Sequence, residues 1–190
     1  MPEQGLEGIA RFLYEMGVLK RLPRSGWLIA GVAAPESIAE HSFRTAILGF
    51  MLAHMEGADP ARTALLCLFH DTQETRIGDV PAVGKGYVTT APNREVTADQ
   101  VASFPPEIGE AVREAVDEYE SQSSIEARVA RDADKLECLL QAREYQDQGY
   151  EDVDAWIESA TAALRTPSAQ RLADLCRRIP PRRWWEVFAR

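Results

Sequence analysis

The sequence Leu65-Leu66-Cys67-Leu68-Phe69-His70-Asp71-Thr72-Gln73-Glu74-Thr75 joins a wholly apolar run to a polar one. Its first five residues present apolar side chains on every face of a helix, so this helix is expected to run through the core. His70 and Asp71 stand where the character changes. Adjacent residues on a helix diverge by about 100°, so both can reach one ion only at the rim of a cavity. A buried His–Asp hydrogen bond would also explain the pair, and the dipeptide alone decides nothing about function.

Capping signals predict further helices on the N-terminal side of this segment. Asp59-Pro60 combines an N-cap residue with proline at the first helical position and predicts the start of the central helix. Ser37-Ile38-Ala39-Glu40 is a capping box, and the helix that it opens is expected to end near Glu56, before Gly57. An earlier amphipathic segment carries apolar residues at helical spacing: Ile9, Phe12, Leu13, Met16 and Leu19.

On the C-terminal side, glycines and prolines between Gly78 and Asn93 predict a long loop. Helical patterns resume near Arg94 and again after Pro105-Pro106. Ser123-Ser124-Ile125-Glu126 resembles a second capping box and predicts a long helix that ends near Gln148.

Two more helices are expected over residues 153–164 and 167–179, the second opened by Thr166-Pro167. Strands do not alternate with helices, and neither a repeat nor a linker is visible. The sequence therefore predicts an all-α, single-domain helical bundle over residues 1–190. Its core would span about residues 10–150, with C-terminal helices over about 151–190.

Composition limits the classes of function. The chain of 190 residues is 45% hydrophobic and 27% charged, as in an ordinary soluble globular domain, and its net charge of −9 argues against binding nucleic acid. Cys67, Cys138 and Cys176 form no CxxC pair, which disfavours disulfides and thiolate zinc sites and favours a cytoplasmic location. A signal-peptide pattern and an apolar stretch long enough to cross a membrane are both missing, so no membrane association is expected.

Two of the three histidines fit a metal site. A single histidine is more often a core or capping residue. However, His41 lies in the first turn of its expected helix, on the inward face shared with Ile38, Thr45 and Leu48. There one ring nitrogen can reach a metal while the other finds a backbone or side-chain partner. With His70-Asp71 and a later aspartate, it would complete a nitrogen and oxygen set for one divalent ion such as Mn, Co, Fe, Ni, Zn or Mg.

Two aspartates compete for the last position in this set. Asp132 has Arg128 four residues before it and Lys135 three residues after it, which favours a solvated ion pair. Asp134 has only small side chains one turn away on its own face, which leaves room for an interior ion. Asp134 is therefore the predicted ligand.

Two further carboxylates lie near the proposed site. Glu74 is one turn beyond His70 on the same face, close enough to contact a metal-bound water and to accept or relay its proton. A surface ion pair with Arg76 or Arg44 is the alternative. Asp79 is either a turn residue or a carboxylate at the rim of the site, and the residues alone leave this open.

The ordered set His41, His70-Asp71 and Asp134 resembles the HD-domain phosphohydrolase superfamily, whose pattern is H…HD…D on an all-α fold. The chain is most similar to its 5′-deoxynucleotidase branch. Four segments carry the resemblance: LKRLPRSGW (19–27), PESIAEHS (35–42), HDTQE through the Gly-Asp at 78–79, and EYESQSS (118–124) through DKLE (134–137). HD alone is common, whereas this set in this order is specific.

The resemblance implies that His41, His70, Asp71 and Asp134 bind one catalytic divalent ion. It also implies that Glu74 activates water and that Asp79, with Val80, lies at a substrate or second-metal position, so Glu74 and Asp79 are the expected catalytic residues. Some relatives distinguish deoxyribose from ribose with an Arg-Trp pair, and the nearest equivalents here, Arg24 and Trp27, are separated by two residues. Trp27 would shape the sugar pocket, or it is a partly buried aromatic between two helices. The expected substrate-binding residues are Arg24, Trp27, Asp71, Asp79, Val80 and Asp134.

The implied reaction is hydrolysis of a (deoxy)nucleoside 5′-monophosphate to nucleoside and phosphate. The nearest alternative is a deoxynucleoside triphosphate triphosphohydrolase, which needs additional cations such as Lys20, Lys85 or Arg94. A dinuclear iron oxygenase or a cyclic-dinucleotide phosphodiesterase needs more histidines. The only spare one, His54, would lie about 20 Å from His41 on a continuous helix. A non-catalytic nucleotide-binding protein is disfavoured, because degenerate relatives usually lose ligands first.

The C-terminal Pro180-Pro181-Arg182-Arg183-Trp184-Trp185 is open to three interpretations. Its aromatic residues would cover the core, close a neighbouring subunit's site or dock in a dimer interface, and its arginines would suit a phosphate. Packing is the favoured interpretation. The resemblance implies a homodimer, on which the sequence itself is silent.

Overall fold

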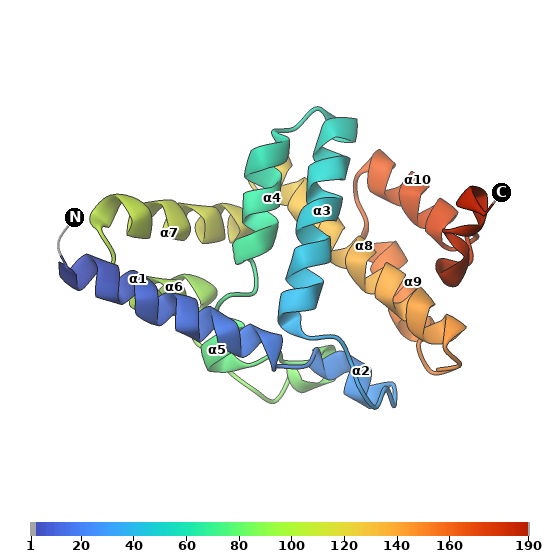
Figure 1. Ribbon diagram of the computed structural model, residues 1–190, viewed down its shortest axis with the longest axis horizontal. Coiled ribbons are helices and arrows are strands. Elements are labelled where there is room, and N and C mark those ends of the chain that lie inside the picture. The colour runs from blue at the N-terminus through green and yellow to red at the C-terminus, as the bar shows by residue number, and fades with distance from the viewer. Residues whose placement is uncertain (1–2, 190) are drawn as a thin grey trace.

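The computed structural model describes residues 3–189, which form helices joined by mostly short loops (Figure 1). The only extended pairing in this part of the chain is an isolated bridge between Pro23 and Ser37, so the all-α prediction is confirmed. The α-helices are α1 (Glu3–Met16), α2 (Ser25–Ile29), α3 (Ile38–Glu56), α4 (Pro60–Phe69), α5 (Glu74–Ile77), α6 (Asn93–Gln100), α7 (Pro106–Ser121), α8 (Ile125–Asp147), α9 (Asp154–Ala163) and α10 (Pro167–Cys176). Short 3-10 turns are η1 (Gly17–Lys20), η2 (Ala82–Gly84), η3 (Pro181–Arg183) and η4 (Glu186–Phe188).

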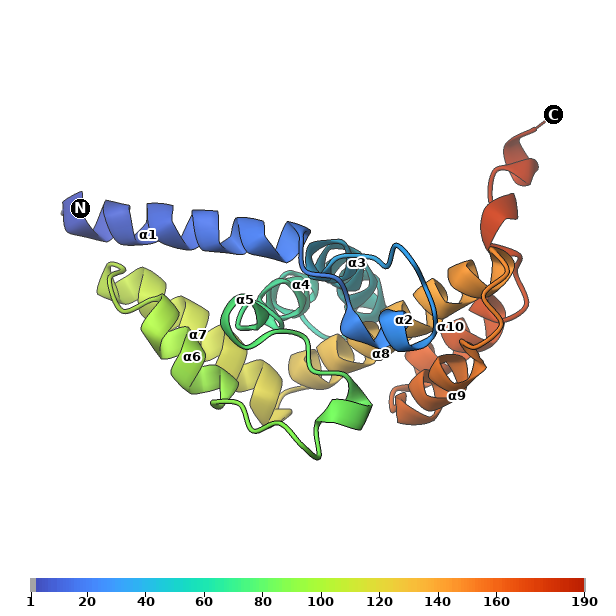
Figure 2. The ribbon, with the colours of Figure 1, turned by 90° about the horizontal axis from the view of Figure 1, so that it is seen from below.

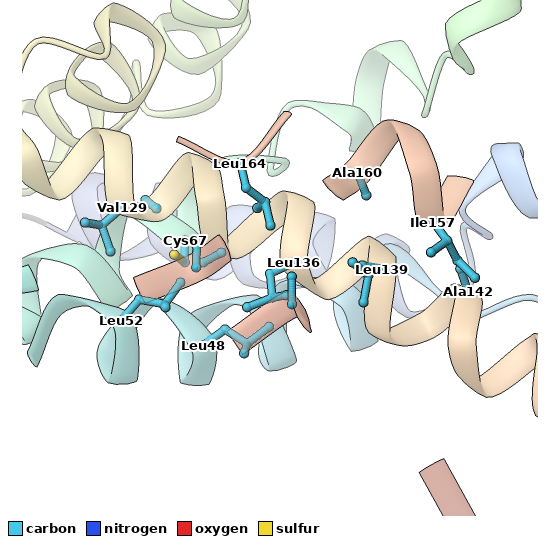
Figure 3. Close-up of a cluster of buried hydrophobic side chains, with 14 of the residues drawn as sticks. Leu48, Leu52, Cys67, Val129, Leu136, Leu139, Ala142, Ile157, Ala160 and Leu164 are labelled. Atoms are coloured by element: carbon cyan, nitrogen blue, oxygen red, sulfur yellow. The ribbon is translucent and has the colours of Figure 1, made fainter. Parts of the chain in front are cut away.

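Three helices form the centre of the fold. α3 and α4 lie side by side, and α8 crosses behind them (Figure 1). Leu52 of α3, Cys67 of α4 and Leu136 of α8 meet in the core, which Ile157 and Ala160 extend to α9 (Figure 3). This arrangement brings α8, from a distant part of the sequence, against two consecutive helices at one buried centre.

α3 and α4 approach each other closely at Gly49. A Cβ on Gly49 would lie 2.6 Å from Cys67 Sγ and 3.2 Å from Thr63 Cγ2, so only glycine allows this separation without displacing a neighbour. The prediction that α4 is buried on all sides is wrong in part. Leu66 and Cys67 are fully buried, but Leu68 is half exposed, because α4 packs against α3, α7 and α8 and leaves the rest of its surface to solvent.

Most of the predicted helix starts are confirmed. Ser37 and Glu40 form the reciprocal capping box of α3, Asp59 accepts hydrogen bonds from the first amides of α4, and the Thr166 hydroxyl caps α10. Gly57 ends α3 with φ of 72°, a left-handed conformation that suits glycine. The predicted helix ends agree with the structure to within three residues.

The second predicted capping box is wrong. Ser124, and not Ser123, is the N-cap of α8, and its hydroxyl accepts from the amide of Ala127. Glu126 therefore falls one position too early to complete a box. Its carboxylate instead accepts from the amide of Asp59 at 3.0 Å and so connects the starts of α8 and α4.

α1 lies along one side of the molecule, opposite α6 and α7 (Figure 2). Phe12 is buried against Phe104, with ring centroids 5.3 Å apart, in the connection between α6 and α7. Leu13, expected on the inward face of α1, is exposed. The apolar spacing predicted the helix correctly, but only Phe12 and Leu19 of its five residues are buried, and Ile9 and Met16 are half-buried.

The C-terminal helices α9 and α10 pack against α8, and the chain beyond them projects away from the bundle (Figure 2). Trp184 is 70% exposed and Trp185 51%, so the interpretation that they cover the core of their own chain is wrong. Arg182 pairs with Asp147 at the end of α8. Among residues 3–189, no helix has the length and apolar content that membrane crossing requires.

Candidate metal centre

The HD dipeptide lies at the end of α4, not within it. Phe69 is the last residue of α4 and His70 is its C-cap, so Asp71 falls in the turn that follows. The backbone still turns helically here, with His70 at φ −61° and ψ −33°, and Asp71 Oδ2 lies 3.0 Å from His70 Nε2. Both residues line the cavity, as expected for neighbouring helical residues that reach one ion.

α3 and α8 bring two more side chains to the same point. His41, in the first turn of α3, is fully buried, and its Nε2 lies 3.3 Å from His70 Nε2. The same atom is 3.7 Å from Asp71 Oδ2 and 3.4 Å from Oδ1 of Asp134, near the middle of α8. Ligand atoms of His41, His70 and Asp71 all lie within 4.8 Å of one another, and Asp134 joins them through His41. The structure thus brings together all four predicted ligands.

Hydrogen bonds orient both histidines with Nε2 toward this cluster. His70 Nδ1 lies 2.7 Å from the carbonyl oxygen of Cys67, which can only accept, so Nδ1 carries a proton. His41 Nδ1 lies 2.5 Å from the carboxylate of Glu137 and donates to it in the same way. In two neutral rings held like this, the Nε2 lone pairs face each other and two carboxylates. Such an arrangement is repulsive unless a cation or a proton lies between the atoms.

The separations suit a divalent ion. Ligands about 2.1 Å from a metal are about 3.0 Å apart at neighbouring octahedral positions and about 3.4 Å apart in a tetrahedron. The distances among His41 Nε2, His70 Nε2 and Asp71 Oδ2 run from 3.0 to 3.7 Å, and Asp134 Oδ1 lies 3.4 Å from His41 Nε2. The two nitrogens and the Asp71 oxygen are therefore spaced to bind one ion, and Asp134 approaches them beside His41 as the fourth donor.

The cluster has a strongly negative local field. Burial and Arg24 lower the pKa of His41, but the carboxylates of Glu137 and Asp134 outweigh them and raise it to about 10. Despite burial, the pKa of Asp71 is held below its usual range, chiefly by His70. His41 therefore holds a proton in this field when no metal is bound, and a metal ion has to displace it.

Glu74 lies on the cavity side of this cluster, at the start of α5. Its Oε2 is buried without a hydrogen-bond partner among residues 3–189. Burial, and then the charges of Asp71 and Asp79, raise the pKa of Glu74 to about 9. Arg76 and Arg44, its suggested surface partners, pair with other carboxylates, so the surface ion-pair interpretation is wrong.

Asp79 and Arg24 are connected at the rim of the site. Asp79 Oδ2 accepts from the Ser25 amide at 2.6 Å, and the Ser25 hydroxyl donates to the Asp79 carbonyl at 2.8 Å. The preceding residue, Arg24, donates from Nη1 to Asp71 Oδ2 at 3.3 Å. Asp79 is thus both a loop residue and a rim carboxylate, and it holds the loop that presents Arg24.

The cluster opens into a cavity of about 430 Å³, a size usual for small-molecule sites. Every predicted site residue except His41 lines it, and His41 contacts the lining residues from the core. Of the three cations suggested for a triphosphate substrate, Lys85 lines this cavity, and neither Lys20 nor Arg94 does.

Trp27 borders the cavity but is mostly a core residue. It is 2% exposed, and its indole nitrogen donates to Glu36 Oε1 at 3.0 Å. Its ring packs against those of Tyr145 and Trp156, with centroids 5.2 and 5.9 Å away. These contacts agree with the interpretation of Trp27 as an aromatic residue between helices. The predicted contact between Trp27 and the sugar stays a prediction.

Sequence reasoning missed several residues at the site. Lys135 Nζ lies 3.0 Å from Asp134 Oδ2, and Arg131 Nη1 lies 3.9 Å from the same oxygen. The helical position of Arg131, one turn before Asp134, was a usable signal. Trp156 gave none, because only tertiary packing brings α9 to the cavity.

Asp132, expected to form an ion pair in solvent, is buried. It is 1% exposed and accepts from the amides of Arg165 and Thr166 at 3.0 and 2.6 Å. The predicted solvated ion pair with Arg128 and Lys135 is therefore wrong, because Asp132 instead binds the start of α10.

His54 does not reach the cluster. α3 is continuous from Ile38 to Glu56, and His54 packs against Phe50 near its C-terminal end. The dinuclear alternatives therefore lack their additional histidine.

Comparison with known proteins agrees with this geometry. A family model described as HD domain matches residues 16–175. The chain belongs to the HD domain family. The 5′-deoxynucleotidase HDDC2 of Mus musculus is 36% identical to it over 142 residues, 74% of this chain and 71% of the relative. The 5′-deoxynucleotidase hdd1 of Schizosaccharomyces pombe is 32% identical over 146 residues, 73% of this chain and 72% of the relative.

Solved structures share the same fold. A conserved hypothetical protein from Pyrococcus furiosus, 29% identical, matches with a TM-score of 0.74 over 90% of this chain and 99% of its own. A predicted metal-dependent phosphohydrolase from Magnetospirillum magnetotacticum, 25% identical, matches with a TM-score of 0.69 over 94% of this chain and 92% of its own. The predicted family is thus confirmed.

Proposed function

We propose that this HD-domain protein is a metal-dependent 5′-nucleotidase that hydrolyses nucleoside or deoxynucleoside 5′-monophosphates to nucleoside and phosphate. The observation that carries the proposal is the convergence of four ligand side chains, from α3, α8 and the end of α4, beside a cavity of small-molecule size. The relatives named 5′-deoxynucleotidases support this reaction over the triphosphohydrolase alternative.

In this proposal His41, His70, Asp71 and Asp134 hold one divalent ion. When bound, the ion polarises a phosphoryl oxygen and lowers the pKa of a water molecule. The mixed donors suit Mn, Co, Mg, Fe, Ni and Zn alike.

Cationic side chains beside the ligands would bind the phosphate. Arg24 bonds to Asp71, and Lys135 and Arg131 both approach Asp134. Their charges offset the negative field of the cluster and can stabilise the charge that develops at phosphorus.

Glu74 would accept the proton of the attacking water. With a pKa of about 9 it is protonated at neutral pH in the ion-free protein. A nearby cation favours its ionised form, in which the otherwise unpartnered Oε2 can accept a proton.

The remaining predicted residues form the substrate side of this proposal. Trp27, Asp79 and Val80 all line the cavity, and we retain them as substrate contacts. Asp79 also remains a candidate catalytic residue, and a second ion, if one is bound, would lie between Glu74 and Asp79.

The test is phosphate release from purified protein with a panel of nucleotides. Ribo- and deoxyribonucleoside 5′-monophosphates and the matching triphosphates are each incubated with each of the six metals after chelator treatment. We expect release from 5′-monophosphates only, and no release with Asp134→Asn. Release from triphosphates alone, or turnover that persists in the variant, would contradict the proposal.

We also propose that the protein is a homodimer. The solvent face of α3 carries Phe43, Ile47, Phe50 and Met51, each more than 40% exposed, and neighbouring exposed apolar side chains of this kind often mark a protein–protein contact. The projecting Trp184 would add to such an interface. Light scattering should give twice the chain mass of 21.1 kDa, and Phe50→Asp should reduce it to a monomer, whereas a monomeric wild type would refute this.

We place the protein in the cytoplasm, because Cys67, Cys138 and Cys176 are all free thiols. Fractionation of cells that produce it, with detection by antibody, would check the compartment.

A further inference from the structure

Glu137 is a charged residue in the core that the proposed chemistry does not use. It lies on α8, one turn beyond Asp134, and its side chain is completely buried. Burying a carboxylate is costly unless it is paired and hydrogen-bonded. Its partners therefore indicate what it does.

Both carboxylate oxygens of Glu137 are engaged. Oε2 accepts from His41 Nδ1 at 2.5 Å. Oε1 receives Arg44 Nε at 2.9 Å and Arg44 Nη2 at 2.7 Å. The carboxylate thus lies between one proposed ligand and a guanidinium, and both come from the same face of α3.

The guanidinium of Arg44 is also held by two residues other than Glu137. Its Nη1 pairs with Glu144 at 2.8 Å, and its Nη2 donates to Gln141 at 2.7 Å. Both partners follow Glu137 on α8. The guanidinium therefore has little freedom, and the two N–H groups that it directs at Oε1 require an acceptor there.

Glu36 is near enough to suggest a second ion site with His41 and Glu137. However, both oxygens of Glu137 already have donors, and Glu36 Oε1 accepts from Trp27. The positive guanidinium of Arg44 also lies against Glu137 and would repel a second cation. We therefore assign this set to hydrogen bonding and not to a second metal.

We propose that Glu137 is a positioning residue that acts through His41. Its carboxylate keeps the proton on Nδ1 and fixes the ring so that the Nε2 lone pair faces His70, Asp71 and Asp134, and Arg44 holds the carboxylate in place. The inference deepens the proposed function, because the ligand that this orientation serves is a divalent cation.

Glu137→Gln provides a sharp test, because Arg44 determines how the new amide is oriented. The amide oxygen must face the guanidinium, so the NH₂ group faces His41 Nδ1. Nδ1 must then accept, and the ring proton moves to Nε2, directly toward the proposed ion. We expect the affinity of the metal-free, full-length protein for Mn²⁺, and in parallel for Zn²⁺, to fall about 10–100-fold by titration calorimetry.

The second measurement is long-range ¹H–¹⁵N NMR of the imidazoles in the metal-free protein, where three histidines make assignment simple. Nδ1 of His41 should be protonated in the wild type and unprotonated in Glu137→Gln. A purely structural role would not move this signal.

The matched control is Asp132→Asn, which removes another buried carboxylate of α8, one that among residues 3–189 accepts hydrogen bonds from Arg165 and Thr166 alone. It should lower the melting temperature and leave the affinity for the metals unchanged. Should Glu137→Gln not fold, Arg44→Lys tests the same link, since one ammonium cannot replace the two-pronged contact, and affinity should fall severalfold.

Wild-type affinity in the folded Glu137→Gln protein, a proton retained on Nδ1, or an equal loss of affinity in Asp132→Asn would each overturn the proposal. In Arg44→Lys, unchanged affinity would overturn it as well. If the wild type binds neither metal, the proposed function fails, while the NMR measurement on metal-free protein still decides the role of Glu137.

Discussion

At the scale of single residues, the site is a balance of opposite charges in a buried space. Burial alone would raise the pKa values of Asp71 and Asp134, yet both are lowered. His70 stabilises the ionised form of Asp71, and His41 and Lys135 stabilise that of Asp134. Glu74 lacks such partners, and its pKa rises to about 9. Within one cavity, Asp71 and Asp134 are therefore ionised and can bind a metal, whereas Glu74 is an acid that can exchange a proton.

This division leads to a prediction for Glu74→Gln. The amide keeps the size of the side chain but cannot exchange a proton, so turnover should fall about 10²–10⁴-fold. The ion of the four-ligand cluster should remain bound, because Glu74 is outside that cluster. Elemental analysis and a phosphate-release assay on the same preparation check both points. Wild-type turnover would refute the proton-transfer role, and lost metal would make Glu74 a ligand.

At the scale of helices, polar contacts determine how the elements around the site are attached. Glu15 of α1 accepts from Arg76 at 2.7 Å, and also from Thr75 and Gln100. One carboxylate thus connects α1 to α5 and α6, next to the turn that carries Asp71. These bonds attach α1, much of whose surface is exposed, to the two helices that follow the HD dipeptide.

Glu15 should make stability depend on pH. Chiefly through the Arg76 hydrogen bond, its pKa falls from 4.5 to about 2 in the folded protein. A lowered folded pKa gives stability that is present above pH 4.5 and is lost as the pH falls toward 2. Glu15→Gln should therefore cost about 1–2 kcal/mol at pH 7. In urea unfolding at several pH values, the difference from wild type should narrow below pH 4.5, and a difference independent of pH would contradict this account.

The contact between α3 and α4 gives a prediction about packing. Gly49→Ala would place its methyl group 2.6 Å from Cys67 Sγ, so α3 and α4 must separate, at a cost of about 1–3 kcal/mol. Gly17→Ala is the control, since nothing lies within 4 Å of its Cβ position. Thermal unfolding should show a lower melting temperature for Gly49→Ala alone. Equal melting temperatures would mean that the helices adjust without cost.

At the scale of the whole molecule, the proposed metal is held by residues that are distant in the chain. His41 and Asp134 come together only after α8 has packed against α3 and α4. A bound ion should therefore stabilise the folded state much more than the unfolded one. Because the four ligands meet only in the folded chain, metal binding should report whether the protein is folded.

Removal of the metal should lower the melting temperature. An ion at 100 times its dissociation constant adds about 2.7 kcal/mol to the free energy of unfolding. For a chain of this length that corresponds to about 5–10 °C. Differential scanning fluorimetry with a chelator, followed by added Mn²⁺, should show the loss and its recovery. Asp134→Asn should not respond to either addition, and a wild type that does not respond would argue against a tightly held ion.

The sequence by itself determined the helical class, most of the helix starts and the four side chains that meet at the centre. These follow from local chemistry: a cap satisfies amides within one turn, and apolar periodicity repeats every few residues. Tertiary structure decided the rest. Asp132 and Asp134 differ by two positions on α8, yet only packing against α10 makes one a buried cap and packing against α3 makes the other a neighbour of His41. In the same way Glu137 and Trp156 reach the site through helix packing, and no spacing along the chain encodes which distant helix a side chain will meet.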